Sequence, residues 1–369
     1  MPIKPSQNDE RSRADPAAPA NADQRDEGDR SVENAIGVPA SVAASGSLER
    51  LVETARDYAA QATAENTNKA YLADWKHFAS WCRRRGADPF TPDPQLIGLY
   101  ITELAAPQDA APALAVSTIE RRLSGLVWTY QQRGEVLDRK DRHIATVLAG
   151  IKRAHAKPAV QKEPIAPDEL LQMVGTLSFS LRDLRDRAIL LIGYAGGFRR
   201  SEIVALDVNR DDTIDGKGWI EIEDEGAIVI QQTKTGWKEV AIGRGSSDDS
   251  CPVHALAQWL HYAKIDHGPV FRRVLRDNSK VQEDRLSDKH VARLIKKTML
   301  DAGIRSDVPE KDRLALFSGH SLRAGLASYA DADERHVQKQ LGHASAEMTR
   351  RYQRRRDRFR INLTKAAGL

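Results

Sequence analysis

The last fifty residues of the chain place a tyrosine among histidines and arginines. Tyr352 lies in a strongly basic run, and the segments His320-Ser-Leu-Arg323 and Leu341-Gly-His343 precede it. A tyrosine hydroxyl titrates near pH ~10, so at neutral pH it needs a base to take its proton and cations to favour its charge. These residues supply both. They predict attack of the tyrosine on a phosphodiester, whose developing negative charge arginine binds through paired hydrogen bonds.

An arginine and a lysine that complete such a site lie further upstream. The apolar run that begins at Ala188 ends in a glycine pair, which predicts a buried helix and a tight turn that leaves Arg199 facing out of the core. Residues 227–232 and 240–242 predict two strands joined by a glycine turn that carries Lys234. The sequence therefore contains six candidate reactive residues in a fixed order.

In that order the residues resemble the motifs of the tyrosine recombinase (phage integrase) family. The segment 197–202, Gly-Phe-Arg-Arg-Ser-Glu, is similar to the family's first arginine motif, and Lys234 to its hairpin lysine. The segment 320–323 is similar to its histidine and arginine box, and Leu-Gly-His at 341–343, followed nine residues later by Tyr352, completes the order. The residue after the first arginine departs from the family, since it is a second arginine where an apolar residue is more usual.

The resemblance implies a mainly α fold with a small antiparallel β-sheet. A helical, SAM-like core-binding domain would precede an α+β catalytic domain, and the two would form a C-shaped clamp around DNA. Tyr352 would attack a DNA phosphate, displace the 5′ hydroxyl and leave a 3′-phosphotyrosyl bond, with no cofactor and no metal ion. The implied roles are phosphate binding for Arg199, Arg323 and His343, proton acceptance for His320, proton donation to the leaving oxygen for Lys234, and orientation of neighbouring groups for Glu202.

The implied partner is double-stranded DNA that carries recombination sites. A 5′ hydroxyl from a partner strand would attack the intermediate, so recombination would need a homotetramer around two sites, with a monomer or dimer on each site before synapsis. Integration, excision and resolution of DNA would all use this chemistry.

Composition agrees with a nucleic-acid partner. The formal charge is +4, but residues 1–47 carry five Lys/Arg against eight Asp/Glu, so the remainder is +7. Seven arginines and one aspartate occupy residues 350–360. Cys82 and Cys251 lie far apart without metal-ligand spacing, which predicts neither a zinc site nor a disulfide framework. With no apolar run of ~18 residues, we expect a cytoplasmic, nucleoid-associated protein without a membrane span.

Composition shifts also predict the domain organisation. Residues 1–47 are too polar to bury a core and predict a disordered tail. Helical periodicity from residue 48 to 155 predicts a domain of four or five helices, the second with Asn66 or Thr67 as its N-cap. A linker spans 156–164, and 165–369 forms the catalytic domain with a C-terminal helix. The candidate DNA contacts are Lys69, Lys76, Arg83, Arg84, Arg121 and Arg122 in the first domain, and Arg350 and Arg351 beside the tyrosine.

Two other functions remain open from the residues alone. A single-site DNA relaxing enzyme of the type IB topoisomerase kind would share the tyrosine and its basic helpers. In a non-catalytic DNA-binding protein the six residues would only touch phosphates. Considered singly, Arg199 could also be a helix-end surface charge, and Lys234 a solvated residue of a hairpin. A metal hydrolase that uses His320 and His343 is disfavoured, since no carboxylate or cysteine has ligand spacing.

Overall fold

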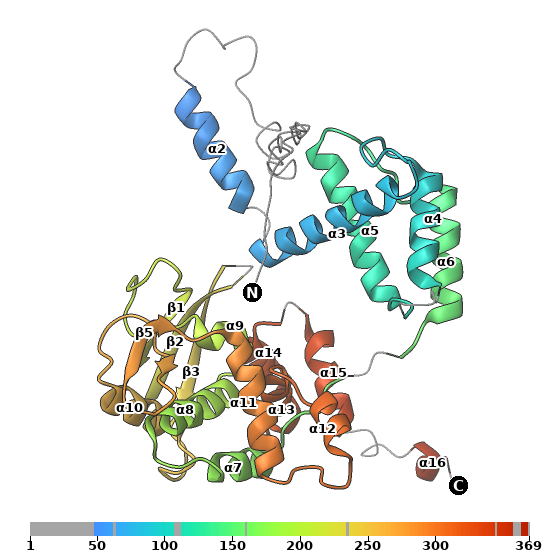
Figure 1. Ribbon diagram of the computed structural model, residues 1–369. Coiled ribbons are helices and arrows are strands. Elements are labelled where there is room, and N and C mark those ends of the chain that lie inside the picture. The colour runs from blue at the N-terminus through green and yellow to red at the C-terminus, as the bar shows by residue number, and fades with distance from the viewer. Residues whose placement is uncertain are drawn as a thin grey trace, which may run out of the picture. The chain divides into compact units, whose positions relative to one another are not determined.

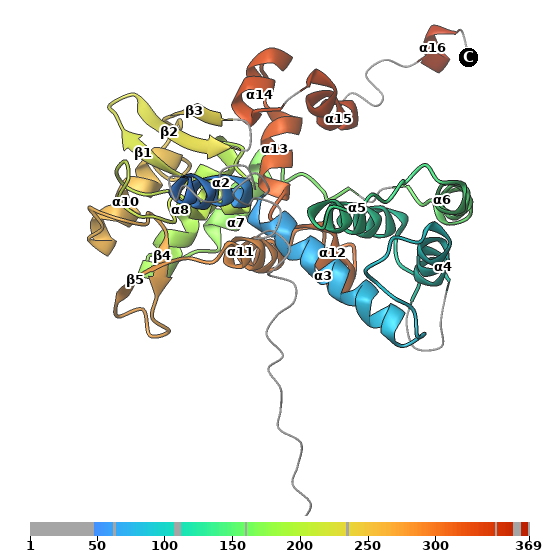
Figure 2. The same ribbon diagram turned by 90° about the horizontal axis from the view of Figure 1, so that it is seen from above.

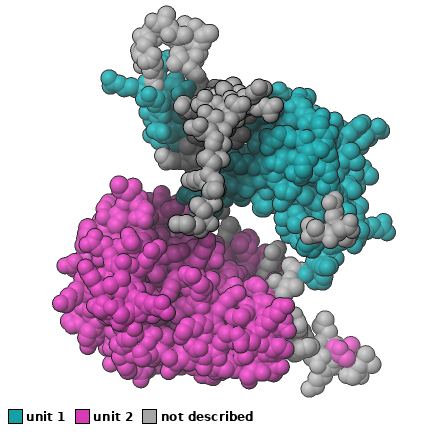
Figure 3. All heavy atoms as spheres, viewed as in Figure 1, with its two compact units in different colours: residues 1–158 teal, residues 159–369 magenta. Residues whose placement is uncertain are grey.

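The chain divides into two compact units, residues 1–158 and 159–369 (Figure 3). Each has its own hydrophobic core. The division falls within the segment 156–164 that the sequence indicates as a linker. This computed structural model describes residues 48–61, 64–106, 112–158, 161–233, 236–343, 345–356 and 363–367.

The first unit is a helical domain around an aromatic core. Trp75, Phe78 and Trp81 recur every three residues, so they lie along one side of their helix. Trp75 meets Tyr130 edge to face with ring centroids 5.4 Å apart, and Trp81 meets Tyr100 at 5.3 Å. The helices are α2 (Glu49–Gln61), α3 (Glu65–Arg83), α4 (Pro94–Ala105), α5 (Val116–Gln132) and α6 (Arg142–His155) (Figure 1).

Aspartates begin two of these helices. The Asp93 carboxylate accepts hydrogen bonds from two backbone N–H groups at the start of α4, and Asp141 accepts one at the start of α6. The predicted N-cap of the second helix at Asn66 or Thr67 is wrong by two or three residues, because the N-cap is Ala64 and α3 begins at Glu65. Its preceding residue is an alanine without a side-chain cap, so no capping signal marked the boundary.

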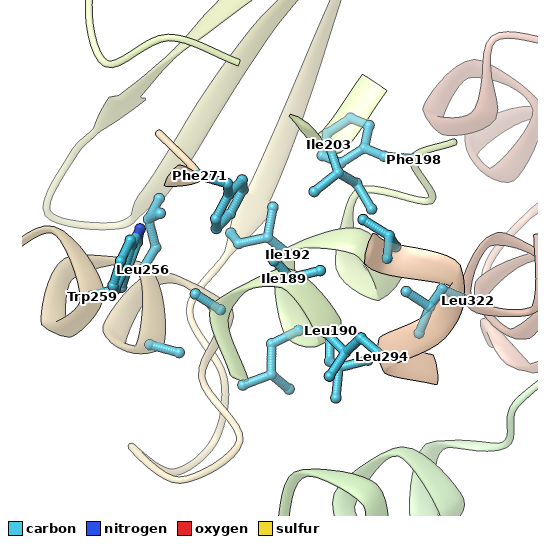
Figure 4. Packing of buried hydrophobic residues seen from close by; sticks show 14 of the residues in the cluster. Ile189, Leu190, Ile192, Phe198, Ile203, Leu256, Trp259, Phe271, Leu294 and Leu322 are labelled. Carbon is cyan, nitrogen blue, oxygen red and sulfur yellow. The ribbon is translucent and has the colours of Figure 1, made fainter. Parts of the chain in front are cut away.

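A buried helix, α8 (Leu181–Ala195), forms the centre of the second unit. Its residues 184–193 are all buried. Ile192 lies on the side of Phe271, whereas Leu190 lies on the side of Leu294 (Figure 4). The helix is therefore packed on opposite sides, which explains why its second half, from Ala188 to Ala195, is an apolar run.

A three-stranded antiparallel sheet packs beside this helical core. Its strands are β1 (Gly218–Ile222), β2 (Gly226–Thr233) and β3 (Gly236–Gly243), in that order. Val240 and Ile242 are buried and alternate with exposed residues, so one face of β3 meets the core. The small sheet predicted between residues 218 and 242 is therefore present, and it extends to Gly243.

A second, two-stranded sheet was not predicted. It is formed by β4 (Arg272–Val274) and β5 (Val281–Arg285). Three of the five β5 side chains are charged, so the apolar alternation that marks a half-buried strand is missing.

The remaining helices complete the second unit. α10 packs on α8, and α13 contacts both α8 and α15. Both views show α13, α14 and α15 grouped together (Figures 1 and 2). The bounds are α7 (Pro167–Gly175), α9 (Arg200–Val204), α10 (Pro252–Ala263), α11 (Asp288–Asp301), α12 (Glu310–Leu316), α13 (Ser321–Tyr329), α14 (Glu334–Leu341), α15 (Ala346–Arg356) and α16 (Leu363–Ala366).

Some predictions fall outside the described residues. They concern the polar tail at 1–47, Lys234 in the β2–β3 connection, and most of the C-terminal helix beyond α15. Within the described ranges, none of the helices is both long and apolar enough to cross a membrane.

Replacing Gly197 by alanine should destabilise the second unit more than the same change at Gly303. Both glycines have a positive φ, 59° and 66°. A Cβ at 197 would lie 2.5 Å from Cδ2 of Leu341, whereas a Cβ at 303 would meet nothing within 4 Å. We expect Gly303→Ala to cost about 1–2 kcal/mol for the left-handed backbone, and Gly197→Ala to cost ~1–3 kcal/mol more for crowding. Urea unfolding measures both, and equal losses would contradict the crowding argument.

Candidate active site

The centre of the site is a contact between a histidine and the candidate nucleophile. His320 precedes the first turn of α13, and Tyr352 lies in α15. His320 Nε2 is 2.5 Å from the Tyr352 hydroxyl oxygen, and the two ring centroids are 5.9 Å apart. A base within hydrogen-bond reach of the hydroxyl is the geometry that proton removal requires.

A second histidine, His343, also contacts the tyrosine ring. The two rings are stacked, with centroids 5.8 Å apart and an interplanar angle of 13°. His343 Nδ1 is 2.9 Å from Oγ1 of Thr349, a fully buried residue one turn before Tyr352. Because Nδ1 is hydrogen-bonded to Thr349, the other ring nitrogen, Nε2, is the one that can form a hydrogen bond to a substrate oxygen.

Arg323 is buried beneath these residues and is only 1% exposed. Its Nη1 donates to the carbonyl of Gly197 at 2.6 Å, and its Nη2 donates to the carbonyl of Leu341 at 2.6 Å. Its Nε is buried and has no hydrogen-bond partner within the described part of the chain. A guanidinium has five N–H groups, so these two carbonyls orient Arg323 without exhausting its donors.

Arg199 is presented by the turn between α8 and α9. Gly197 adopts a positive φ in this turn, and Phe198 is fully buried, so the following arginine emerges half-exposed. The carboxylate of Glu202 accepts from the Arg199 backbone N–H at 2.8 Å and from Nη1 at 2.5 Å. Glu202 thus fixes both the backbone and the guanidinium of Arg199, and it does so from the first turn of α9.

The electrostatics of the cluster favour neutral histidines. Burial, then the positive charges of Arg323 and Arg199, hold the pKa of His320 below its ordinary value. The same causes, burial first, lower the pKa of His343 to about 4. Burial also lowers the pKa of Arg323, to about 10, so this residue still carries its charge at neutral pH.

The structure brings five of the six candidate reactive residues into this cluster. They share one site through the contacts above and through the charge effects of Arg199 and Arg323 on both histidines. Lys234 lies outside the described residues.

Two neighbouring residues were missed by the sequence analysis. Thr349 could have been found from its place one helical turn before Tyr352. Lys238 could have been found from strand alternation, because it shares the inward face of β3 with Val240 and Ile242.

The candidate DNA contacts have different surroundings. Arg121 and Arg122 both pair with Asp74, which is only 3% exposed, so they also neutralise a buried carboxylate. Lys69, Lys76, Arg83 and Arg84 are exposed on or beside α3. Among these, Lys69 pairs with Glu65, and Arg83 donates to Ser80 at 3.2 Å.

Of the two arginines beside the tyrosine, Arg350 is exposed and pairs with Glu334 at 3.0 Å. The side chain of Arg351 is not described.

The chain is similar to several known proteins. Residues 163–358 match the phage integrase family. An integrase/recombinase XerD homologue from Selenomonas ruminantium is 31% identical over 326 residues, which cover 85% of this chain and 89% of the relative. The Cre recombinase of Escherichia phage P1 is 24% identical over 307 residues, 80% of this chain and 84% of Cre.

A solved structure shares the fold. It is the XerH site-specific recombinase bound to palindromic difH substrate in a post-cleavage complex, and it matches with a TM-score of 0.55 and 16% identity. The match covers 89% of this chain and 86% of that one. The chain therefore belongs to the phage integrase family of tyrosine recombinases.

Lowering the pH from about 7 to about 5 should weaken the folded protein through His343. Its pKa is about 4 in the folded protein against an ordinary 6.5, so in this window the unfolded chain binds the proton and the folded chain does not. Stability is then lost as the pH falls through the unfolded pKa. In His343→Gln this component is absent, and the fall in unfolding free energy should be smaller.

Urea unfolding at both pH values measures this difference. His261→Gln, the same change at an exposed position on α10, is the matched control and should follow wild type. A His343→Gln protein that loses as much stability as wild type would contradict the assignment.

Proposed function

We propose that the protein cleaves and rejoins DNA with Tyr352 as the nucleophile and His320 as its base. The observation that carries this proposal is the 2.5 Å approach of His320 Nε2 to the tyrosine hydroxyl. Because the pKa of His320 is lowered, chiefly by burial, the imidazole is neutral at neutral pH and can accept the proton. The tyrosine oxygen then attacks phosphorus, and the bond from phosphorus to the 5′ oxygen breaks.

Two arginines would stabilise the charge that develops on the phosphate. Arg199 is half-exposed and held by Glu202, so it can reach a substrate without losing its orientation. Arg323 is fixed by two backbone carbonyls and is buried, so it would act on the phosphate through its positive charge. Charges fixed before the reaction stabilise a transition state without reorganisation, and a buried site strengthens them.

The leaving oxygen needs a proton, and Lys234 is our proposed donor. The product is a 3′-phosphotyrosyl bond, which conserves the energy of the broken phosphodiester. A 5′ hydroxyl that attacks this bond restores the phosphodiester and releases Tyr352, so the reaction needs no energy from a nucleotide cofactor. His343, with Nε2 opposite Thr349, is the proposed hydrogen-bond donor to the phosphate.

Site-specific recombination is the function of the family to which the chain belongs. Two duplex sites contain four strands, and one tyrosine cleaves one strand, so we propose a homotetramer on two sites with a monomer or dimer on each site beforehand. A DNA relaxing enzyme would act as a monomer on one duplex. The recombinase assignment is favoured because the match to the XerD homologue covers 89% of that relative.

Tyr352→Phe should abolish formation of a covalent protein–DNA adduct, because it removes only the attacking oxygen. The substrate is nicked DNA bearing a candidate site, taken from DNA that flanks the gene, incubated without metal or ATP and resolved on a denaturing gel. Wild type should give an adduct that protease removes. Tyr329→Phe, a partly exposed tyrosine on α13, is the control and should keep adduct formation.

Three outcomes separate the candidate functions. An adduct followed by exchange of strands between two labelled duplexes supports the recombinase. An adduct with relaxation but no exchange supports the relaxing enzyme. Retarded DNA on a native gel without an adduct from wild type would establish the non-catalytic DNA-binding protein.

Arg84→Ala should weaken DNA binding by the helical unit and reduce its salt dependence. We propose that the exposed cations on α3 contact phosphates, and removing one phosphate contact lowers the slope of log K against log salt by ~0.9. Fluorescence anisotropy over a salt series measures the slope. Arg142→Ala on α6 makes the same charge change outside the proposed face, and an equal loss of slope in both variants would contradict the assignment.

A further inference from the structure

Lys238 lies next to the candidate active site and has no role in the mechanism proposed above. Lys238 is half-buried on β3 and points to the same face as the core residues Val240 and Ile242. A lysine at such a position is unusual because an ammonium loses hydration when it is buried. Burial, and next the positive charge of Arg323, lower the pKa of Lys238 to about 8.

The lysine is directed at the end of α14. Its Nζ donates to the backbone carbonyl of Gln340, and its stem lies so close to Gly342 that a Cβ there would be 3.1 Å from Lys238 Cδ. Gly342 has φ 62° and ends the helix in the left-handed conformation. The last carbonyls of a helix carry partial negative charge and lack helical partners, so a cation is favoured at this place.

Other contacts tie the same helix end to the site. The Gln340 side-chain amide donates to the carbonyls of Ala195 and Ala241, both at 3.2 Å. Arg323 donates to the carbonyl of the next residue, Leu341. The chain then turns through Gly342 to His343, whose ring stacks on the nucleophile. The position of His343 therefore depends on how firmly the end of α14 is held.

We propose that Lys238 is a positioning residue, whose ammonium group fixes the turn at 340–343 so that His343 and Arg323 are aligned on the phosphate and the tyrosine. This inference rests on the proposed function. The charged groups around it are Arg323 on α13, Glu202 on α9 and Arg199 before α9, with the titratable His343 at the turn itself. Glu202 is the acidic member of this set, so it favours the charged ammonium.

Lys238→Met tests the role, since methionine keeps an unbranched stem and removes the charge and the donor. The rate of covalent adduct formation on nicked DNA, measured in a single turnover with saturating protein, should fall about tenfold or more, the effect of losing a charged hydrogen bond. DNA affinity should stay within about twofold, because Lys238 acts through the turn. Lys217→Met, an exposed lysine just before β1, is the matched control and should keep the wild-type rate.

The pH profile separates an ionic role from mere packing. In wild type the adduct rate should decline above about pH 8, where Lys238 loses its proton. Lys238→Arg keeps its charge in that range, so its rate should persist to higher pH, and Lys238→Met should be slow without this decline. If Lys238→Met does not fold, the Lys238→Arg profile decides, and a profile identical to wild type overturns the proposal.

A substrate with sulfur in place of the leaving 5′ oxygen separates positioning from proton donation. Sulfur leaves without needing a proton, so it would rescue the loss of a proton donor but not a misplaced turn. If Lys238→Met forms the covalent adduct equally slowly on both substrates, the proposal is supported. Full rescue, or a Lys238→Met rate within twofold of wild type on ordinary DNA, overturns it. An absence of adduct from wild type would instead overturn the proposed function itself, before any variant is compared.

Discussion

The buried guanidinium of Arg323 is the interaction on which the site depends. Its two terminal nitrogens bind the carbonyls of Gly197 and Leu341, which belong to the turn after α8 and to the end of α14. One side chain thus joins the segment that presents Arg199 to the segment that presents His343. A buried cation costs hydration energy that two neutral carbonyls only partly offset. The arrangement is understandable if the positive charge of Arg323 stabilises a phosphate bound at the site.

Burial, together with the same concentration of positive charge, favours the neutral form of both histidines. Burial and the charges of Arg323 and Arg199 lower the pKa of both His320 and His343. A neutral His320 can take a proton from a phenol, whereas a protonated one could only donate. The cations would therefore bind substrate charge, favour the tyrosinate and keep the base unprotonated, and these three effects are consequences of one cluster.

Sequence reasoning found most of the site because its chemistry demands particular residue types. A tyrosine, histidines and arginines in a fixed order identify the class without coordinates, and the apolar run before Arg199 predicted the buried helix that positions it. Lys238 was missed, although strand alternation places it on the face of Val240 and Ile242, because a lysine in a strand is usually exposed. Arg121 was grouped with the surface cations because no sequence signal pairs it with Asp74, 47 positions away. The short strand β5 was not predicted, because four of its five residues are polar or charged.

The proposed nucleophile and the arginine before α9 lie beside hydrophobic clusters of different size. Arg199 lies beside Phe198 in the extensive core of the second unit, whereas Tyr352 packs against a small cluster formed by Ala327, Val337 and Leu341. Segments with few buried apolar contacts open at lower free energy than the main core. We therefore expect the segment that carries Arg199 to be more rigid than α15, the helix that carries Tyr352. That difference suits a reaction in which the tyrosine must first reach a phosphate held in place and then leave it.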